Sequence, residues 1–152
     1  MKVEMRFLAT LFLGFTMTTT SWAKCPADLA IYHHGASDKF TLTFSKQKNP
    51  KAWSNIEADL SFGMQRLKFE FTASNGYPME YLVSLDEKLI NTRDNLVLFF
   101  DKNLKALSLP QAGEAAPEYI VMPEMGLWLK ELQLKSNPFL PPGMWKLSGC
   151  QK

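Results

Sequence analysis

The sequence predicts an all-β protein: an antiparallel β-sandwich or small barrel of about eight or nine short strands, preceded by a cleaved N-terminal signal helix. Apolar and polar residues alternate along most of the chain, as they do in strands with one buried face. Turn-forming residues recur at intervals of about 10–15 residues, which is typical of hairpins. The first 23 residues have the layout of a secretory signal.

The signal predicted at residues 1–23 begins with a weakly basic stretch containing Lys2 and Arg6. An uncharged apolar run of 11 residues follows at 7–17, and the small residues Ser21 and Ala23 complete a cleavage site. A membrane-spanning helix needs about 20 apolar residues, so this run predicts a cleaved signal rather than an anchor. Lipidation of Cys25 is disfavoured because Lys24 stands where a small residue is required. Residues 24–152 are then one β-sandwich domain.

Composition excludes several classes of protein. The formal charge of +2 falls to +1 without Lys2, Glu4 and Arg6, which argues against nucleic-acid binding and against a polybasic membrane anchor. The content of 46% hydrophobic and 12% aromatic residues argues against disorder. The chain is therefore expected to be globular, with no permanent membrane span.

Cys25 and Cys150 are the two cysteines of the chain, and they lie near the two ends of the mature domain. Two lone cysteines in an oxidising compartment pair most often with each other. A redox pair would be expected as C-x-x-C, a motif that the sequence lacks. We therefore predict a Cys25–Cys150 disulfide that closes the domain 24–152.

Strands are predicted wherever the alternation is clear. Residues 96–100 are instead continuously apolar, which predicts a strand buried on both faces. Segment 125–135 is ambiguous, because Met125, Trp128, Leu129 and Leu132 would share one helical face. A strand with a bulge near Lys130 would instead bring Leu127, Leu129, Leu132 and Leu134 together, and we favour the strand. The predicted strands are 40–45, 55–62, 67–72, 79–85, 96–100, 104–109, 118–122, 127–134 and 144–149.

One hairpin can be specified in register. Gly63-Met64 suits a two-residue type II′ turn, which pairs Phe62 with Gln65. Further turns are predicted at Asn75-Gly76 and at 101–103, where Asn103 can take a left-handed conformation. The inward-facing pairs of the hairpin are then Leu60/Leu67, Ala58/Phe69 and Ile56/Phe71. On the outward face, Asp59 and Lys68 form an attractive pair. Glu57 and Glu70 repel each other unless a cation lies between them.

Chemistry-bearing residues are few. His33 and His34 are adjacent, so on a strand they would point to opposite faces and could not share a metal ion. On a loop they would be weak ligand candidates with Asp38 and Asp28. The sequence contains no G-x-S-x-G, H-E-x-x-H or phosphate-binding glycine loop. We therefore predict no catalytic residue, metal or cofactor.

Two loops carry aromatic residues suited to contacts. Tyr77 and Pro78 follow the Asn75-Gly76 turn, and residues 137–145 form an apolar, proline-rich segment with Phe139, Leu140 and Trp145. Aromatic anchors dominate interface energies, and prolines reduce the entropy lost when a loop is ordered. These five residues are the predicted partner-binding set. The alternative is that Phe139, Leu140 and Trp145 fold inward and close one end of the sandwich.

These features predict a monomeric, non-enzymatic binding module, exported to the bacterial periplasm or outside the cell. It would contact another protein, as inhibitors, immunity proteins and accessory proteins do. The first alternative is a carrier of an apolar ligand or lipid, with a cavity between the sheets lined by Phe40, Phe69 and Phe99. The second is a hydrolase, which would require His33 or His34 to meet a carboxylate in a cleft. A solid core with an exposed aromatic loop favours the protein-binding module, whereas an internal cavity favours the carrier.

Overall fold

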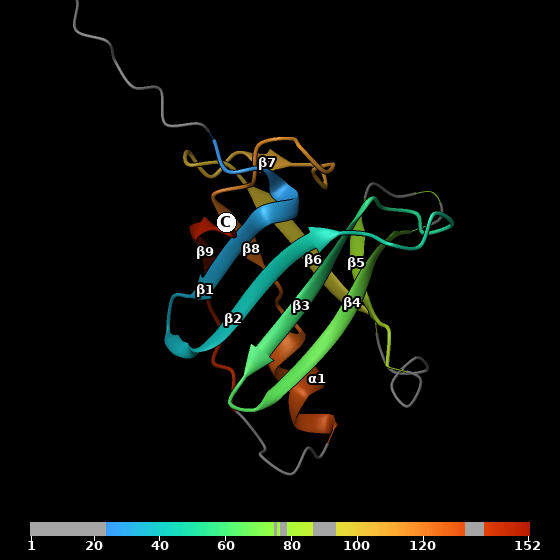
Figure 1. The fold of residues 1–152 in the computed structure, drawn as a ribbon. Coiled ribbons are helices and arrows are strands. Elements are labelled where there is room, and N and C mark those ends of the chain that lie inside the picture. Colours follow the sequence, from blue (N-terminus) through green and yellow to red (C-terminus); the bar gives the residue numbers. More distant parts are fainter. Residues whose placement is uncertain (1–23, 75, 77–78, 87–93, 133–138) are drawn as a thin grey trace, which may run out of the picture.

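The computed structural model describes residues 24–74, 76, 79–86, 94–132 and 139–152. Within them, almost all regular structure is β (Figure 1). In chain order the elements are η1 (Ala27–Leu29), β1 (Ala30–His34), β2 (Ser37–Lys46), β3 (Ile56–Phe62), β4 (Gln65–Ala73), β5 (Glu80–Ser84), β6 (Asn95–Phe100), β7 (Ala106–Leu107), β8 (Tyr119–Val121), α1 (Met125–Glu131) and β9 (Met144–Cys150).

The strands form one closed antiparallel barrel. Their order is β5-β4-β3-β2-β1-β9-β8-β6, and β6 pairs back with β5 to complete a ring of eight. The short β7 adds to β6 outside this ring. Closure leaves the ring with no continuous open edge, which removes the main route to edge-to-edge aggregation. The predicted all-β fold class is confirmed in its small-barrel form.

Aromatic rings fill the inside of the barrel. The ring of Phe44 lies 5.1 Å from that of Tyr32 and 5.3 Å from that of Phe71, which in turn lies 6.0 Å from Phe99. Phe40, Phe69 and Phe99, the predicted cavity lining, are each at most 1% exposed. Eight strands give an interior just wide enough for side chains to fill. These three residues therefore belong to the buried core of the barrel.

The β3–β4 hairpin has the predicted register. Phe62 pairs with Gln65, Leu60 with Leu67 and Ala58 with Phe69. Gly63 has a φ of 54°, whereas Met64 is not among the described residues with positive φ, as a type II′ turn requires. The predicted pair Ile56/Phe71 lies one position beyond the paired residues. The turn at Gly63-Met64 fixes this register, and the alternation agrees with it, because a slip of one residue would turn the whole apolar face outward.

The outer face of this hairpin carries a compact group of ion pairs. Arg66 donates two hydrogen bonds to Asp59, at 3.0 Å from Nε to Oδ1 and 2.8 Å from Nη2 to Oδ2. Lys68 Nζ lies 3.8 Å from Glu57 Oε1 and 3.9 Å from Asp59 Oδ2. Glu57 does stand opposite Glu70, and Lys68 places a positive charge beside Glu57. Hydrogen bonding to Asp59 raises the pKa of Arg66.

The prediction of a strand is wrong over residues 127–131, because these residues belong to α1. Met125, Trp128 and Leu129 are buried on one helical face, and the Trp128 ring lies 5.5 Å from that of Phe69 in β4. Both interpretations of the pattern buried Leu129, so the local sequence did not separate them. A helix satisfies its own backbone hydrogen bonds, so it can cover the core without a strand edge to pair with. Leu134 lies outside the described residues.

Two smaller predictions also need correction. Strand β6 is not buried on both faces, since Leu98 is 37% exposed and alternates with the buried Val97 and Phe99. The outward face of the barrel is in contact with water at this point. The turn after Asp101 is present, with Asp101 Oδ1 accepting hydrogen bonds from the backbone N–H groups of Asn103 at 2.8 Å and Lys105 at 2.9 Å. The left-handed residue there is Leu104, with a φ of 61°, rather than Asn103.

The Cys25–Cys150 disulfide is present, with 5.8 Å between the Cα atoms. It lies where the two ends of the described chain meet, since Ala30 at the start of β1 pairs with Cys150 at the end of β9. The bond therefore reinforces a contact that the barrel already makes between its first and last strands. Among the described residues, no helix is both long and apolar enough to cross a membrane.

Candidate binding groove

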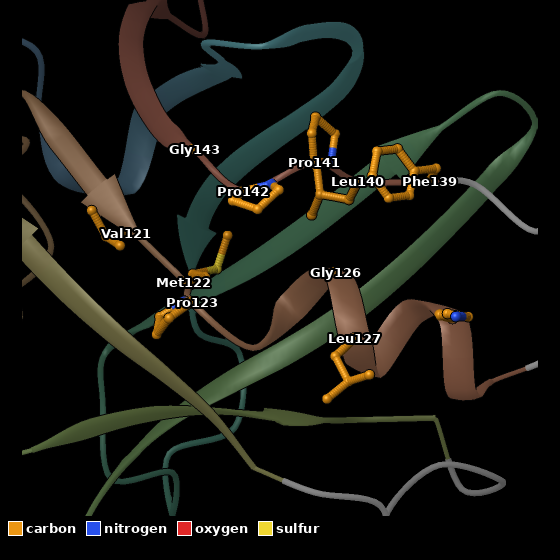
Figure 2. Close-up of a pocket in the computed structure, with 11 residues that line it drawn as sticks. Val121, Met122, Pro123, Gly126, Leu127, Phe139, Leu140, Pro141, Pro142 and Gly143 are labelled. Carbon is orange, nitrogen blue, oxygen red and sulfur yellow. The ribbon is translucent and has the colours of Figure 1, made fainter.

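A groove of about 600 Å³ lies outside the barrel core, between α1 and the segment that leads into β9 (Figure 2). Its lining comes from residues 121–123, from Gly126, Leu127 and Lys130 of α1, and from residues 139–143. Lys130 is the only charged residue that the structure describes in this lining. The groove is open to solvent along one side, so it is a surface site rather than an internal cavity.

Two glycines allow the segment 139–143 to lie close to its neighbours. A Cβ added to Gly126 would stand 2.5 Å from the carbonyl oxygen of Leu140. A Cβ added to Gly143 would stand 2.8 Å from Cε1 and 2.9 Å from Nε2 of His34. Pro141 and Pro142, between these contacts, restrict the backbone further. The segment is therefore held against α1 at one point and against β1 at another.

The structure divides the predicted contact residues of this segment. Phe139 is 80% exposed at the rim of the groove, whereas Leu140 and Trp145 are 5% and 1% exposed and belong to the core. The prediction of a contact surface is corrected for Trp145, which is buried and lines neither pocket, whereas Leu140 is also buried but contributes to the lining of the groove. The alternative of inward folding holds for these two residues and fails for Phe139. The other two predicted contact residues, Tyr77 and Pro78, lie outside the described residues.

His34 supports the groove from behind. It is 4% exposed, its ring meets that of Trp145 edge-on at 5.1 Å, and its Nδ1 accepts a hydrogen bond from the Ala36 backbone N–H at 3.3 Å. Burial lowers the pKa of His34 below its ordinary value. An Nδ1 that accepts a hydrogen bond is unprotonated, which agrees with a neutral ring.

The weak metal candidates are not brought together. His33 is exposed and His34 is buried, on opposite faces of β1, as the alternation of a strand requires. Asp38 is exposed, and Asp28 accepts a hydrogen bond from the Gly113 backbone N–H at 2.7 Å. The part of the chain that the structure describes contains no group of three or more His, Cys, Asp or Glu side chains placed to hold a metal ion.

A second pocket, of about 710 Å³, lies beside the disulfide. Lys24, Lys102, Asp101, Glu114 and Glu118 contribute to its lining, so its charges are mixed. The Asp101 and Glu114 carboxylates already accept backbone hydrogen bonds, the latter from Gln111 at 2.8 Å. This lining is less suited to an apolar partner than that of the groove.

The half of the groove that comes from residues 121–130 was not predicted from the sequence. Leu127 gave the available signal: in the helical interpretation it falls opposite Met125 and Leu129, and it is indeed 51% exposed. A leucine on the solvent side of an amphipathic helix indicates either chance exposure or a contact surface.

Neither a protein-family model, nor a curated protein, nor a solved structure matches this chain.

Proposed function

We propose that this chain is an exported, non-enzymatic binding protein that recognises another protein through the groove and Phe139. One observation carries the proposal: an aromatic side chain 80% exposed to solvent stands at the rim of an apolar groove, on a segment held in place by glycine and proline. Exposed apolar patches of this kind mark interaction sites, and aromatic anchors beside pockets contribute most to binding.

Export to the bacterial periplasm is part of the proposal. The signal-like pattern at residues 1–23 supports it, and so does the Cys25–Cys150 disulfide, since such bonds persist in oxidising compartments. Intact mass spectrometry of the protein from its own cells tests this. A mass equal to residues 24–152 less two hydrogens is expected, and a mass that retains residues 1–23 would contradict cleavage.

An apolar small molecule is the second candidate ligand. The volume of the groove, about 600 Å³, favours it, because it lies within the usual range for small-molecule sites. Such sites enclose most of their ligand, however, and this groove is open along one side. Native mass spectrometry separates the candidates, because a bound small molecule and a bound protein give different added masses.

The decisive experiment compares two exposed aromatic residues. Phe139 lines the groove, whereas Trp53, which is 58% exposed, lines neither of the two pockets described above. The protein is cross-linked in its own compartment as wild type, Phe139→Ala and Trp53→Ala. We expect Phe139→Ala to weaken capture of the partner by about tenfold or more, as hot-spot truncations do, and Trp53→Ala to leave capture unchanged. Equal capture by all three proteins would overturn the proposal.

A further inference from the structure

We infer that the element of the partner that occupies the groove is an amphipathic α-helix, with apolar residues facing Leu127 and Phe139 and an acidic residue facing Lys130. The inference rests on the proposed function and adds the chemistry of the occupant. The backbone of the groove walls, the open shape of the groove and the charge at Lys130 all favour such an occupant.

The walls of the groove offer no place for strand addition. Val121, at the sheet side, belongs to β8, which is already paired on both sides, with Leu98 of β6 and with Met144 of β9. The second wall is α1, and the third contains Pro141 and Pro142, which have no N–H to donate. An extended peptide would leave its own backbone groups unpaired against these walls, at a considerable cost. A helix satisfies its backbone hydrogen bonds internally and needs only side-chain contacts.

The shape of the groove also favours a helix. Leu127 lies on α1 and Phe139 on the segment across the groove from it (Figure 2). Their side chains are 51% and 80% exposed. An occupant must therefore cover apolar surface on one side while its other side stays in water. An amphipathic helix has this division between an apolar stripe and a polar face. A free acyl chain would leave much of its own surface exposed, whereas small-molecule sites normally bury about 70–90% of the ligand.

Lys130 defines the expected charge of the partner. It lies three residues after Leu127 in α1, and residues three apart lie on the same side of a helix. A carboxylate on the flank of the bound helix would complement it. Such a pair at the rim of an interface mainly sets orientation and partner choice rather than overall affinity.

Peptide display tests the inference while the partner itself is unidentified. Random peptides of about 16 residues, long enough to form a helix, are selected on the oxidised protein. The enriched peptides are then measured against Leu127→Glu and against Leu104→Glu, a control at a leucine that is 59% exposed and lines neither pocket. A fluorescent fatty acid, cis-parinaric acid, is measured on the same three proteins.

The expected result is enrichment of peptides with apolar residues at i, i+3, i+4 and i+7 and with Asp or Glu at the flank. Leu127→Glu should weaken the binding of these peptides at least about tenfold, and Leu104→Glu should leave their binding unchanged. Lys130→Glu should also weaken them, and a peptide with Lys in place of its acidic residue should recover binding to that variant. This reciprocal exchange would not follow from a purely structural role of Lys130.

The other outcomes overturn the inference in distinguishable ways. Peptides that depend on Leu127 but show alternating or proline-rich patterns would exclude a helix while leaving the protein-binding function intact. If no peptide depends on Leu127, the helix is excluded, and the capture experiment with Phe139→Ala decides the proposed function. If the fatty acid alone binds in a Leu127-dependent way, the occupant is an acyl chain, and both proposals fail.

Discussion

Gly126 of α1 lies directly against the carbonyl group of Leu140, so closely that a Cβ at position 126 would stand 2.5 Å from the carbonyl oxygen. This contact joins the two walls of the groove. Leu127, the next residue along the helix, lines the groove and is half exposed. The width of the groove therefore depends on the absence of a side chain at Gly126.

Gly126→Ala should destabilise the protein. In an unobstructed helix this change stabilises by about 1 kcal/mol, but here the helix or the 139–143 segment must shift. We expect a net loss of about 1–3 kcal/mol, as for other overpacked sites. The matched control is Gly149→Ala, since a Cβ at Gly149 meets no heavy atom within 4 Å. Urea unfolding measures the free energy of unfolding of both variants. A Gly126→Ala protein as stable as wild type would show that the contact between Gly126 and Leu140 is loose.

Truncation to Ala should lower the stability of the protein at Trp145 but have little effect on it at Phe139. Trp145 is 1% exposed, and its replacement by Ala should lower the free energy of unfolding by about 3–5 kcal/mol. Phe139 is 80% exposed, and Phe139→Ala should stay within about 0.5 kcal/mol of wild type. Thermal or urea unfolding distinguishes the two variants. A large loss for Phe139→Ala would place that ring in the core and remove it from the binding surface.

His34 should make stability depend on pH. Because burial lowers its pKa in the folded state, the unfolded chain binds the proton more readily, at a pKa of about 6.5. The stabilising contribution is therefore complete above about pH 6.5 and is lost as pH falls through the folded-state pKa. Urea unfolding at about pH 7.5 and about pH 5 should show a smaller loss on acidification for His34→Gln than for wild type. His33→Gln, at the exposed neighbour, should retain the wild-type loss; an unchanged pH dependence in His34→Gln would refute this role.

Removal of the disulfide should lower stability without changing the fold. The bond closes a loop with a sequence separation of 125 residues, and constraint of so long an unfolded chain contributes up to about 4–5 kcal/mol. The double variant Cys25→Ser, Cys150→Ser should therefore melt at a lower temperature while keeping the circular dichroism of a β protein. A melting temperature equal to that of wild type would show that pairing between β1 and β9 is sufficient alone.

Substitution by Asp should have very different effects on folding at two adjacent residues of β3, because their side chains face opposite sides of the barrel wall. Leu60 is fully buried among core residues, so Leu60→Asp should abolish folding. Ser61 points outward and pairs with Arg66 on β4, so Ser61→Asp should be tolerated. Expression level and circular dichroism show whether each of the two variants folds. A folded Leu60→Asp protein would mean that the faces of the hairpin are reversed.

Local features of the sequence determined the faces and the register of the β3–β4 hairpin. A side-chain period of two is a property of each strand by itself, so Leu60 and Phe69 could be placed inward independently of the rest of the fold. Strand β1 was not among the predicted strands, so only the structure shows that the adjacent His33 and His34 lie on opposite faces of a strand. The pairing of Cys25 with Cys150 followed because the chain offers each cysteine no other partner.

Tertiary structure decided what depends on distant parts of the chain. Segment 125–131 fits two periods, and its helical form follows from the core surface that Trp128 covers against Phe69. The choice of barrel over sandwich depends on the pairing of β5 with β6, which no local pattern encodes. Phe139 is exposed while Leu140 is buried because Leu140 packs against Gly126, in another element. The sequence by itself determined which way side chains point along a strand; the groove required the three-dimensional meeting of segments, because its walls are separate in the chain and adjacent only in the fold.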